Sequence, residues 1–328
     1  MVPPIGVGVT PFQTDDEATV RLAVRAEELG YGRFAAAEGW THDAPVLLAR
    51  IATLTSRIGL ATGVLPVWSR TPAAIAMAAT SLQRASGGRF ALGLGASSPP
   101  LVEGLHGIEW REPVSQMRTT LVAVRALLAG ERLPLDREHV RPLRLGSPPE
   151  EQIPIFLAAL APASVRLAGE LADNWLPFLW ARSRLSDGRA LLAEGEAARE
   201  DSTPTGVAAS VPLAIARDEE TARQIAAGWL LAYVTRMGPI YPRMLRDVFG
   251  YAAAVDALLE ANADGGVPQL PVAAEQLASE VTLMATYDQA PEAIRLWLDA
   301  GADTVDLVLP LGLPEAQLKE MLEAAAPR

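Results

Sequence analysis

Short apolar runs alternate with longer amphipathic stretches along almost the whole chain. Eight of these runs have the character of buried strands. They lie at residues 5–9, 33–37, 58–65, 89–95, 153–158, 173–176, 206–216 and 304–309. The stretches between them predict helices at 43–54, 72–83, 114–128, 162–171, 185–199, 219–233, 291–300 and 315–325. The first helix is predicted to begin earlier, at the capping box TDDE of residues 14–17.

A strand followed by a helix, repeated eight times, favours a parallel sheet, because parallel neighbours need crossover connections. Eight such units predict an α/β fold that closes into a (β/α)8 TIM barrel, and an open doubly wound sheet is the alternative. A barrel needs roughly 250 residues. Most of the residues beyond that number lie at about 217–303. We therefore expect a mostly helical insertion between the seventh and eighth strands of one domain.

Composition acts mainly by excluding classes of function. The 328 residues carry 39 acidic and 28 basic side chains, a formal net charge of −11, and the bases do not cluster. A nucleic-acid partner is therefore not expected. Arginines interrupt every long apolar stretch, so no membrane span is expected. The first residues lack the basic segment of a signal peptide, and the chain has no cysteine, which together fit a cytoplasmic location.

Candidate chemistry follows from the strand ends, where barrels carry their functional groups. Small and hydroxyl-bearing residues at 62–64, 95–98 and 159–160 predict a floor for a flat ring. The turn at 159–162 opens a helix whose free amides suit an anion. Glu38 and His42 project from one strand end and are candidate acid–base residues, although a salt bridge to a barrel arginine is the alternative for Glu38. The histidine spacing does not match a metal site, so no metal is expected.

Four segments carry a resemblance to a known family. They are AAAEGWTHDA with RIGLATGVLPVWSRTPAAIAMAATSLQRASGGRFALGLGASSPPLVEGLHG, then IPIFLAALAPASVRLAGELADNWLP, then AYVTRMGPIYPRMLRDVFGYA, and last LDAGADTVDLVLP. Through them the chain resembles the bacterial luciferase-like monooxygenase superfamily, and within it the branch that uses the deazaflavin coenzyme F420. The resemblance spans essentially all of residues 1–328 and implies a single luciferase-like TIM-barrel domain.

The resemblance also implies roles for particular residues. A non-prolyl cis peptide is expected at Gly63–Val64, against the cofactor ring. The implied cofactor-binding residues are Trp40, Gly63, Val64, Ala96, Ser97, Ser98, Ala159, Leu160 and Ala161. Of these, residues 96–98 would line the cofactor tail and the amides of 159–161 would hold its phosphate. The turn ALAP at 159–162 departs from the family, in which glycines are frequent there. Similar proteins are often dimers, so a homodimer is expected.

The leading hypothesis is an oxidoreductase that moves a hydride between C5 of reduced F420 and a small organic substrate. Glu38, buried beside Trp40 and with a raised pKa, would be the general acid, and His42 is the alternative. Two other interpretations stay open, namely a two-component monooxygenase that uses FMN and a barrel that binds a flavin without catalysis. The part of the insertion at 236–282 is expected to cover the barrel mouth or to form a subunit contact.

Overall fold

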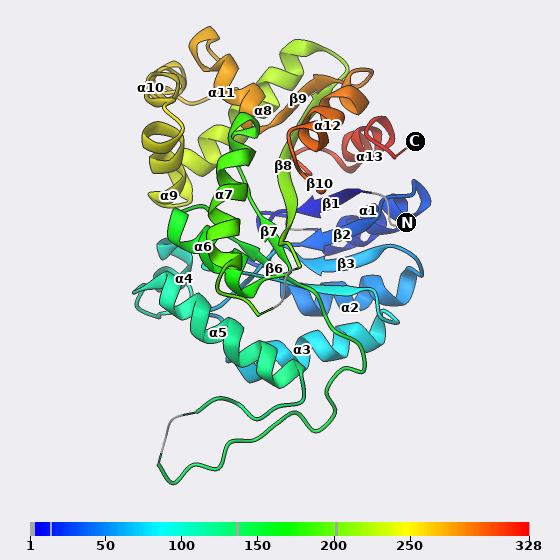
Figure 1. The fold of residues 1–328 in the computed structure, drawn as a ribbon. Helices are drawn as coiled ribbons and strands as arrows, with labels where there is room; N and C mark the ends of the chain where they lie inside the picture. Colours follow the sequence, from blue (N-terminus) through cyan, green and yellow to red (C-terminus); the bar gives the residue numbers. More distant parts are fainter. Residues whose placement is uncertain (1–3, 14, 136–137, 201–202, 328) are drawn as a thin grey trace.

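The structure is a barrel of eight parallel strands surrounded by helices (Figure 1). The computed structural model describes residues 4–13, 15–135, 138–200 and 203–327. The barrel strands are β1 (Ile5–Val9), β2 (Arg33–Ala36), β3 (Gly59–Thr62), β5 (Phe90–Gly95), β6 (Ile155–Ala158), β7 (Asn174–Leu176), β8 (Gly206–Ala216) and β10 (Thr304–Val308). Strand β10 pairs with both β1 and β8, which closes the ring. The predicted TIM barrel is therefore confirmed, and the open sheet is excluded.

The helices follow the predicted order, with some additions. They are α1 (Asp16–Glu28), α2 (Ala44–Leu54), α3 (Pro72–Ala85), α4 (Pro99–Gly104), α5 (Pro113–Leu128), α6 (Pro162–Leu171), α7 (Leu185–Glu196), α8 (Glu219–Arg236), α9 (Ile240–Arg243), α10 (Ala252–Ala261), α11 (Glu275–Val281), α12 (Ala290–Asp299) and α13 (Glu315–Ala324). Short 3-10 turns lie at Arg182–Arg184 and Val272–Ala274, and a π-helical turn lies at Met244–Val248.

Side-chain caps fix where several of these helices begin. Asp43, the predicted cap of α2, accepts a hydrogen bond from the Val46 amide at 3.0 Å. The N-cap of α1 is Asp15, which accepts from the Ala18 amide at 2.9 Å. This places the cap one residue later than the predicted capping box implies, and Thr14 itself lies outside the described residues.

Two apolar clusters make up the core. The larger fills the space between the strands and the surrounding helices. The smaller lies among side chains of the barrel strands and consists of Ala35, Ala61, Ala91, Phe156, Leu176 and Ala208. Four of its six members are alanines, so this layer occupies little volume. The small side chains of this layer leave room for a cavity, which Ala35 and Leu176 line.

The insertion between β8 and β10 carries α8 to α12 and one strand that sequence analysis did not predict. That strand is β9 (Leu283–Thr286), and it pairs with the second half of β8 from Leu213 to Ala216. A second short strand, β4 (Leu65–Pro66), pairs with the end of β5.

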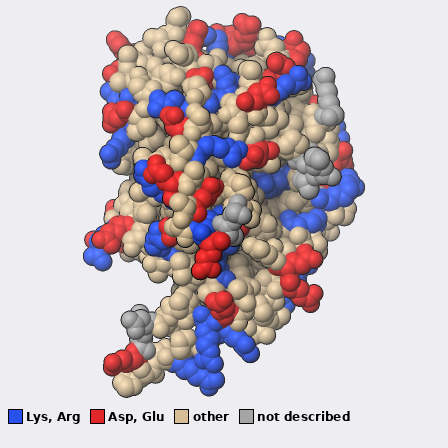
Figure 2. Space-filling view, in the orientation of Figure 1, with Lys and Arg blue, Asp and Glu red and all other residues tan. Residues whose placement is uncertain are grey.

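The connection between α5 and β6 extends away from the barrel (Figure 1). On the face shown in Figure 2, acidic and basic side chains are interspersed over the barrel, and a group of basic side chains lies near this extended connection. None of the helices in the described part of the chain combines the length and apolarity that a membrane crossing requires.

Candidate functional site

A cavity of about 430 Å³ opens at the C-terminal ends of the barrel strands. Each strand end contributes to its wall, and most of the contributing side chains are small. Lining residues from successive strand ends are Gly8, Ala35, Gly63, Gly95, Ala158, Leu176, Ser210 and Val308. This is the position at which TIM barrels carry their functional groups. The cavity is therefore the candidate active site.

The insertion forms one wall of the cavity. Met237, Ile240, Tyr241 and Arg243 line it from the end of α8 through α9. The insertion also approaches the β5 end closely, because a Cβ on Gly238 would lie 3.4 Å from Cδ of Pro99. The insertion therefore lies over the mouth and meets its rim on the far side. The other expectation, a subunit contact, stays a prediction.

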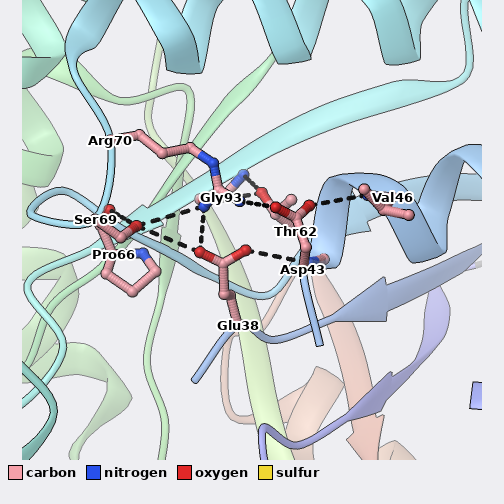
Figure 3. Close-up of polar contacts among 9 residues, drawn as sticks. Glu38, Asp43, Val46, Thr62, Pro66, Ser69, Arg70 and Gly93 are labelled. Atoms are coloured by element: carbon pink, nitrogen blue, oxygen red, sulfur yellow. Dashed lines mark hydrogen bonds and ion pairs between the residues drawn. The ribbon is translucent and has the colours of Figure 1, made fainter. Parts of the chain in front are cut away.

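Glu38 lies at the cavity but is engaged in an ion pair (Figure 3). One carboxylate oxygen accepts from the Arg70 guanidinium and from Oγ of Ser69 at 3.3 Å, and the other accepts from the Ala44 amide at 3.1 Å. Arg70 also pairs with Asp43. Burial lowers the pKa of Arg70, but its interactions with Glu38 and Asp43 together outweigh this and raise the pKa overall. The salt bridge considered for Glu38 is thus present.

His42 and Trp40 follow Glu38 in sequence but do not line the cavity. The His42 side chain is only 3% exposed, and its Nδ1 lies 3.1 Å from Oγ1 of Thr41 and 3.7 Å from a carboxylate oxygen of Asp16. Its Nε2 is buried and has no partner among the described residues. Trp40 is 46% exposed and packs edge-on against Phe12. These two side chains therefore lie beside the cavity rather than in it.

The peptide bond between Gly63 and Val64 is cis, as the family resemblance implied. Both residues line the cavity. Their backbone is held by β2, because the Gly63 amide donates to Ala36 at 2.8 Å and the Glu38 amide donates to the Val64 carbonyl at 3.0 Å. Gly95 lies against the same point, where a Cβ would come within 2.8 Å of Cγ2 of Val64. This part of the floor has no room for a larger side chain.

The predicted tail-binding residues Ala96, Ser97 and Ser98 also line the cavity. Ser97 adopts a left-handed conformation, with φ at 66°. Ser98 is 3% exposed, and its hydroxyl has no hydrogen-bond partner among the described residues. A buried hydroxyl without a partner is costly, so this group is suited to a ligand.

The predicted phosphate-binding turn lies between the end of β6 and the start of α6. Ala159, Leu160 and Ala161 line the cavity, and so does Ser164 in the first turn of α6. Helix α6 has no side-chain cap, and Pro162 supplies no amide at its first position. The N-terminal end of α6 therefore presents its remaining positive partial charge toward the cavity.

A buried ion pair lies among the side chains of the barrel strands. Asp306 of β10 is 3% exposed and lines the cavity, and one of its oxygens accepts from Arg33 at 2.6 Å. The Arg33 guanidinium lies over the Phe156 ring, 4.6 Å from its centroid. The second oxygen of Asp306 has no partner among the described residues. No group of three histidine, aspartate or glutamate side chains in the described ranges is arranged to hold a metal ion.

Sequence reasoning missed four residues at or beside this cavity, namely Arg70, Tyr233, Tyr241 and Asp306. Arg70 and Asp306 could have been sought as charges at or near strand ends, but the sequence does not say which acid meets which base. The tyrosines come from the insertion, and the only signal for them was the aromatic spacing of AYVTRMGPIY.

Comparison with known proteins identifies the family. A proposed coenzyme F420-dependent oxidoreductase of Mycobacterium tuberculosis is 30% identical over 90% of both chains. The 5,10-methylenetetrahydromethanopterin reductase of Methanolobus tindarius is 26% identical over 81% of both. The solved F420-dependent tetrahydromethanopterin reductase of Methanopyrus kandleri superposes with a TM-score of 0.75 at 19% identity, covering 98% of this chain and 97% of that one. The family model for luciferase-like monooxygenases matches residues 6–304, and the chain belongs to that family.

Proposed function

We propose that this protein is an oxidoreductase that uses coenzyme F420 to transfer a hydride to or from a small organic substrate. The observation that carries the proposal is the cavity floor, in which Gly63–Val64 meets the β5 end beside the unpartnered hydroxyl of Ser98. Two relatives whose matches cover 90% and 99% of this chain are both named as F420-dependent enzymes, which supports the choice of coenzyme.

The cavity residues fit such a coenzyme. A flat ring would lie against Gly63, Val64 and Gly95, where no larger side chain fits. The tail would pass the Ser97 and Ser98 hydroxyls, and its phosphate would meet the N-terminal end of α6 at Ala161. The coenzyme, when bound, supplies a carbon that gives up or accepts a hydride. The chain's own contribution is to orient the ring, exclude water and handle the accompanying proton.

Glu38 or His42 as the residue that exchanges this proton stays a prediction. Glu38 lies at the cavity but is paired with Arg70, and the His42 side chain is buried beside the cavity. The variant Glu38→Gln tests the prediction directly. If Glu38 is the proton donor, turnover is lost while coenzyme affinity is kept. Loss of both would instead assign Glu38 to binding.

A titration of the purified protein with F420 and with FMN tests the coenzyme. F420 is expected to bind, and Ser98→Ala is expected to weaken it by about fivefold, the value of one hydrogen bond near 1 kcal/mol. Ser86→Ala is the matched control, because that serine is equally buried but donates within its own turn and lies outside the cavity. Tight FMN binding with no F420 binding would overturn the proposal.

The family name supplies the second candidate, a two-component monooxygenase in which reduced FMN activates oxygen. Oxygen consumption with reduced FMN and incorporation of oxygen into the product would favour it. The third candidate, a barrel that binds a flavin or another planar ligand without turning anything over, predicts no reaction with any reductant. It also predicts that the ligand is released unchanged.

We also propose that the protein is a cytoplasmic homodimer. The absence of cysteine supports the location, since nothing in the chain needs an oxidising compartment. Exposed apolar side chains on neighbouring helices support the dimer, and they include Val46 and Leu54 of α2 and Met77 of α3. Light scattering after size exclusion would give twice the chain mass of 34.8 kDa. A single-chain mass at micromolar concentration would contradict the proposal.

A further inference from the structure

Five side chains that line the cavity could in principle exchange a proton. They are Glu38, Tyr233, Tyr241, Arg243 and Asp306. Both acids are already held by arginines, Glu38 by Arg70 and Asp306 by Arg33. Arg243 is an exposed guanidinium, which stays protonated at any ordinary pH. The two phenols are left, and neither has a hydrogen-bond partner among the described residues.

The two tyrosines form one aromatic cluster on the insertion side of the cavity. Their ring centroids lie 4.9 Å apart, and Phe178, at the end of β7, lies 4.7 Å from Tyr233 and 6.2 Å from Tyr241. Phe12, after β1, lies 6.3 Å from Tyr233. The phenol oxygens are thus the polar ends of side chains whose rings are packed against one another. Hydroxyls fixed in an apolar wall are suited to orient a polar atom of a ligand.

Burial raises the pKa of both phenols, and for Tyr233 the neighbouring Tyr241 raises it further. Both hydroxyls therefore keep their protons throughout the neutral range and act as hydrogen-bond donors. Protonated phenols next to an apolar surface can bind a carbonyl oxygen, which accepts hydrogen bonds and carries no charge that the cavity would have to neutralise.

We infer that Tyr233 and Tyr241 bind the carbonyl oxygen of a ketone or enone substrate and that this pair, rather than Glu38, supplies the proton of the reaction. The inference rests on the proposed function, because it assumes that a hydride is delivered in the same cavity. It names the substrate class as a carbonyl compound with an apolar body, since Phe178, Met237 and Ile240 line the cavity together with the two tyrosines. The charged side chain of this wall, Arg243, is exposed to solvent.

The substrate in this step is a ketone. The hydride supplied by the reduced coenzyme forms a C–H bond at the carbonyl carbon, and the π electrons of the carbonyl move to its oxygen. That oxygen takes the phenol proton, so an O–H bond of tyrosine breaks and an O–H bond of the alcohol forms. The coenzyme is oxidised, the ketone is reduced, and solvent returns a proton to the phenolate after product leaves. Because an alkoxide is a stronger base than even a buried phenolate, the proton transfer runs downhill.

The test compares Tyr233→Phe and Tyr241→Phe with the wild-type protein. Each change removes one oxygen and keeps the ring that packs in the cluster. The control is Tyr251→Phe, which lies in the same insertion and is also partly buried, but does not line the cavity. The substrates are acetone, cyclohexanone and cyclohex-2-enone with reduced F420. The measurements are kcat, KM, the solvent isotope effect on kcat and the F420 dissociation constant.

We expect at least one cavity variant to lose kcat by about 100-fold, the usual contribution of a positioned acid, and to lose its solvent isotope effect. Its F420 dissociation constant should stay within about twofold of wild type, and Tyr251→Phe should match wild type throughout. Reduction of a ketone at the wild-type rate by both variants and by the double variant would overturn the inference about the tyrosines but leave the proposed function standing. Binding of F420 without reduction of any of the three carbonyls would overturn that inference too. If F420 does not bind at all, the proposed function is contradicted, and the inference that rests on it is overturned as well.

Discussion

The ion pair between Glu38 and Arg70 gives the sharpest prediction for stability. Arg70→Met keeps most of the apolar stem and removes the charge that faces a carboxylate only 7% exposed. Removing one partner of a fully buried pair costs about 3–5 kcal/mol. Arg70 retains 19% exposure, and Glu38 keeps its bonds from the Ala44 amide and Ser69. We therefore expect a loss of about 2–3 kcal/mol in the free energy of unfolding.

Urea unfolding followed by tryptophan fluorescence measures this loss, from the shift in midpoint at constant slope. The double variant Glu38→Gln with Arg70→Met should recover a large part of it, because no charge is then left unpaired. Arg21→Met is the control, since its pair with Glu315 is 51% and 26% exposed and solvent screens it, so its loss should shift the midpoint much less than Arg70→Met does. Equal small losses in Arg70→Met and the control would refute the assignment of a buried, coupled pair.

Three further predictions concern other parts of the fold. Gly228→Ala in α8 should raise the free energy of unfolding by about 0.5–1 kcal/mol, because the added methyl would meet only ordinary contacts and alanine favours a helix; an unchanged urea midpoint would contradict this. Gly6→Ala should cost about 2 kcal/mol or more, because the new Cβ would overlap the carboxylate of Asp306, and soluble protein of wild-type melting temperature would contradict it. Hydrogen bonding from Arg21 holds the pKa of Glu315 at about 2, against 4.5 for a free glutamate, so its stabilising contribution is complete above pH 4.5 and is lost as the pH falls toward 2; Glu315→Gln should flatten the stability curve in that window, and parallel curves would refute the coupling.

The fold was largely predictable because its signals are local. Each barrel strand is a short apolar run, and many helices begin at a proline, as α3 and α6 do, or at an acidic cap such as Asp43 or Asp218. The differences arise where pairing depends on distant segments. Strand β9 is four residues long and exists because the second half of β8 offers it a free edge. No window of sequence around Leu283 contains that information.

The candidate site also has a part that could be predicted from the sequence and a part that could not. The backbone features of the floor, at Gly63 and Gly95, follow strand ends and could be located in the sequence. The partners of the charged side chains could not, because Glu38 and Arg70 are separated by the whole of α2 and β3. The tyrosines were missed for another reason. They reach the cavity from the insertion. Its part at 236–282 was expected to cover the barrel mouth, but the sequence does not indicate which of its side chains line the cavity.

Strand β8 pairs with two different strands along its length. Its first half pairs with β10 in the barrel, and its second half pairs with β9 outside the barrel. The same continuous backbone therefore links the cavity at the strand ends to the insertion that carries Tyr233 and Tyr241. If the insertion is exchanged between relatives to change substrate preference, the junctions should lie before Leu213 and after β9, so that the two paired segments are moved together. A junction at the end of β8 would separate the insertion from the second half of β8, with which its strand β9 pairs.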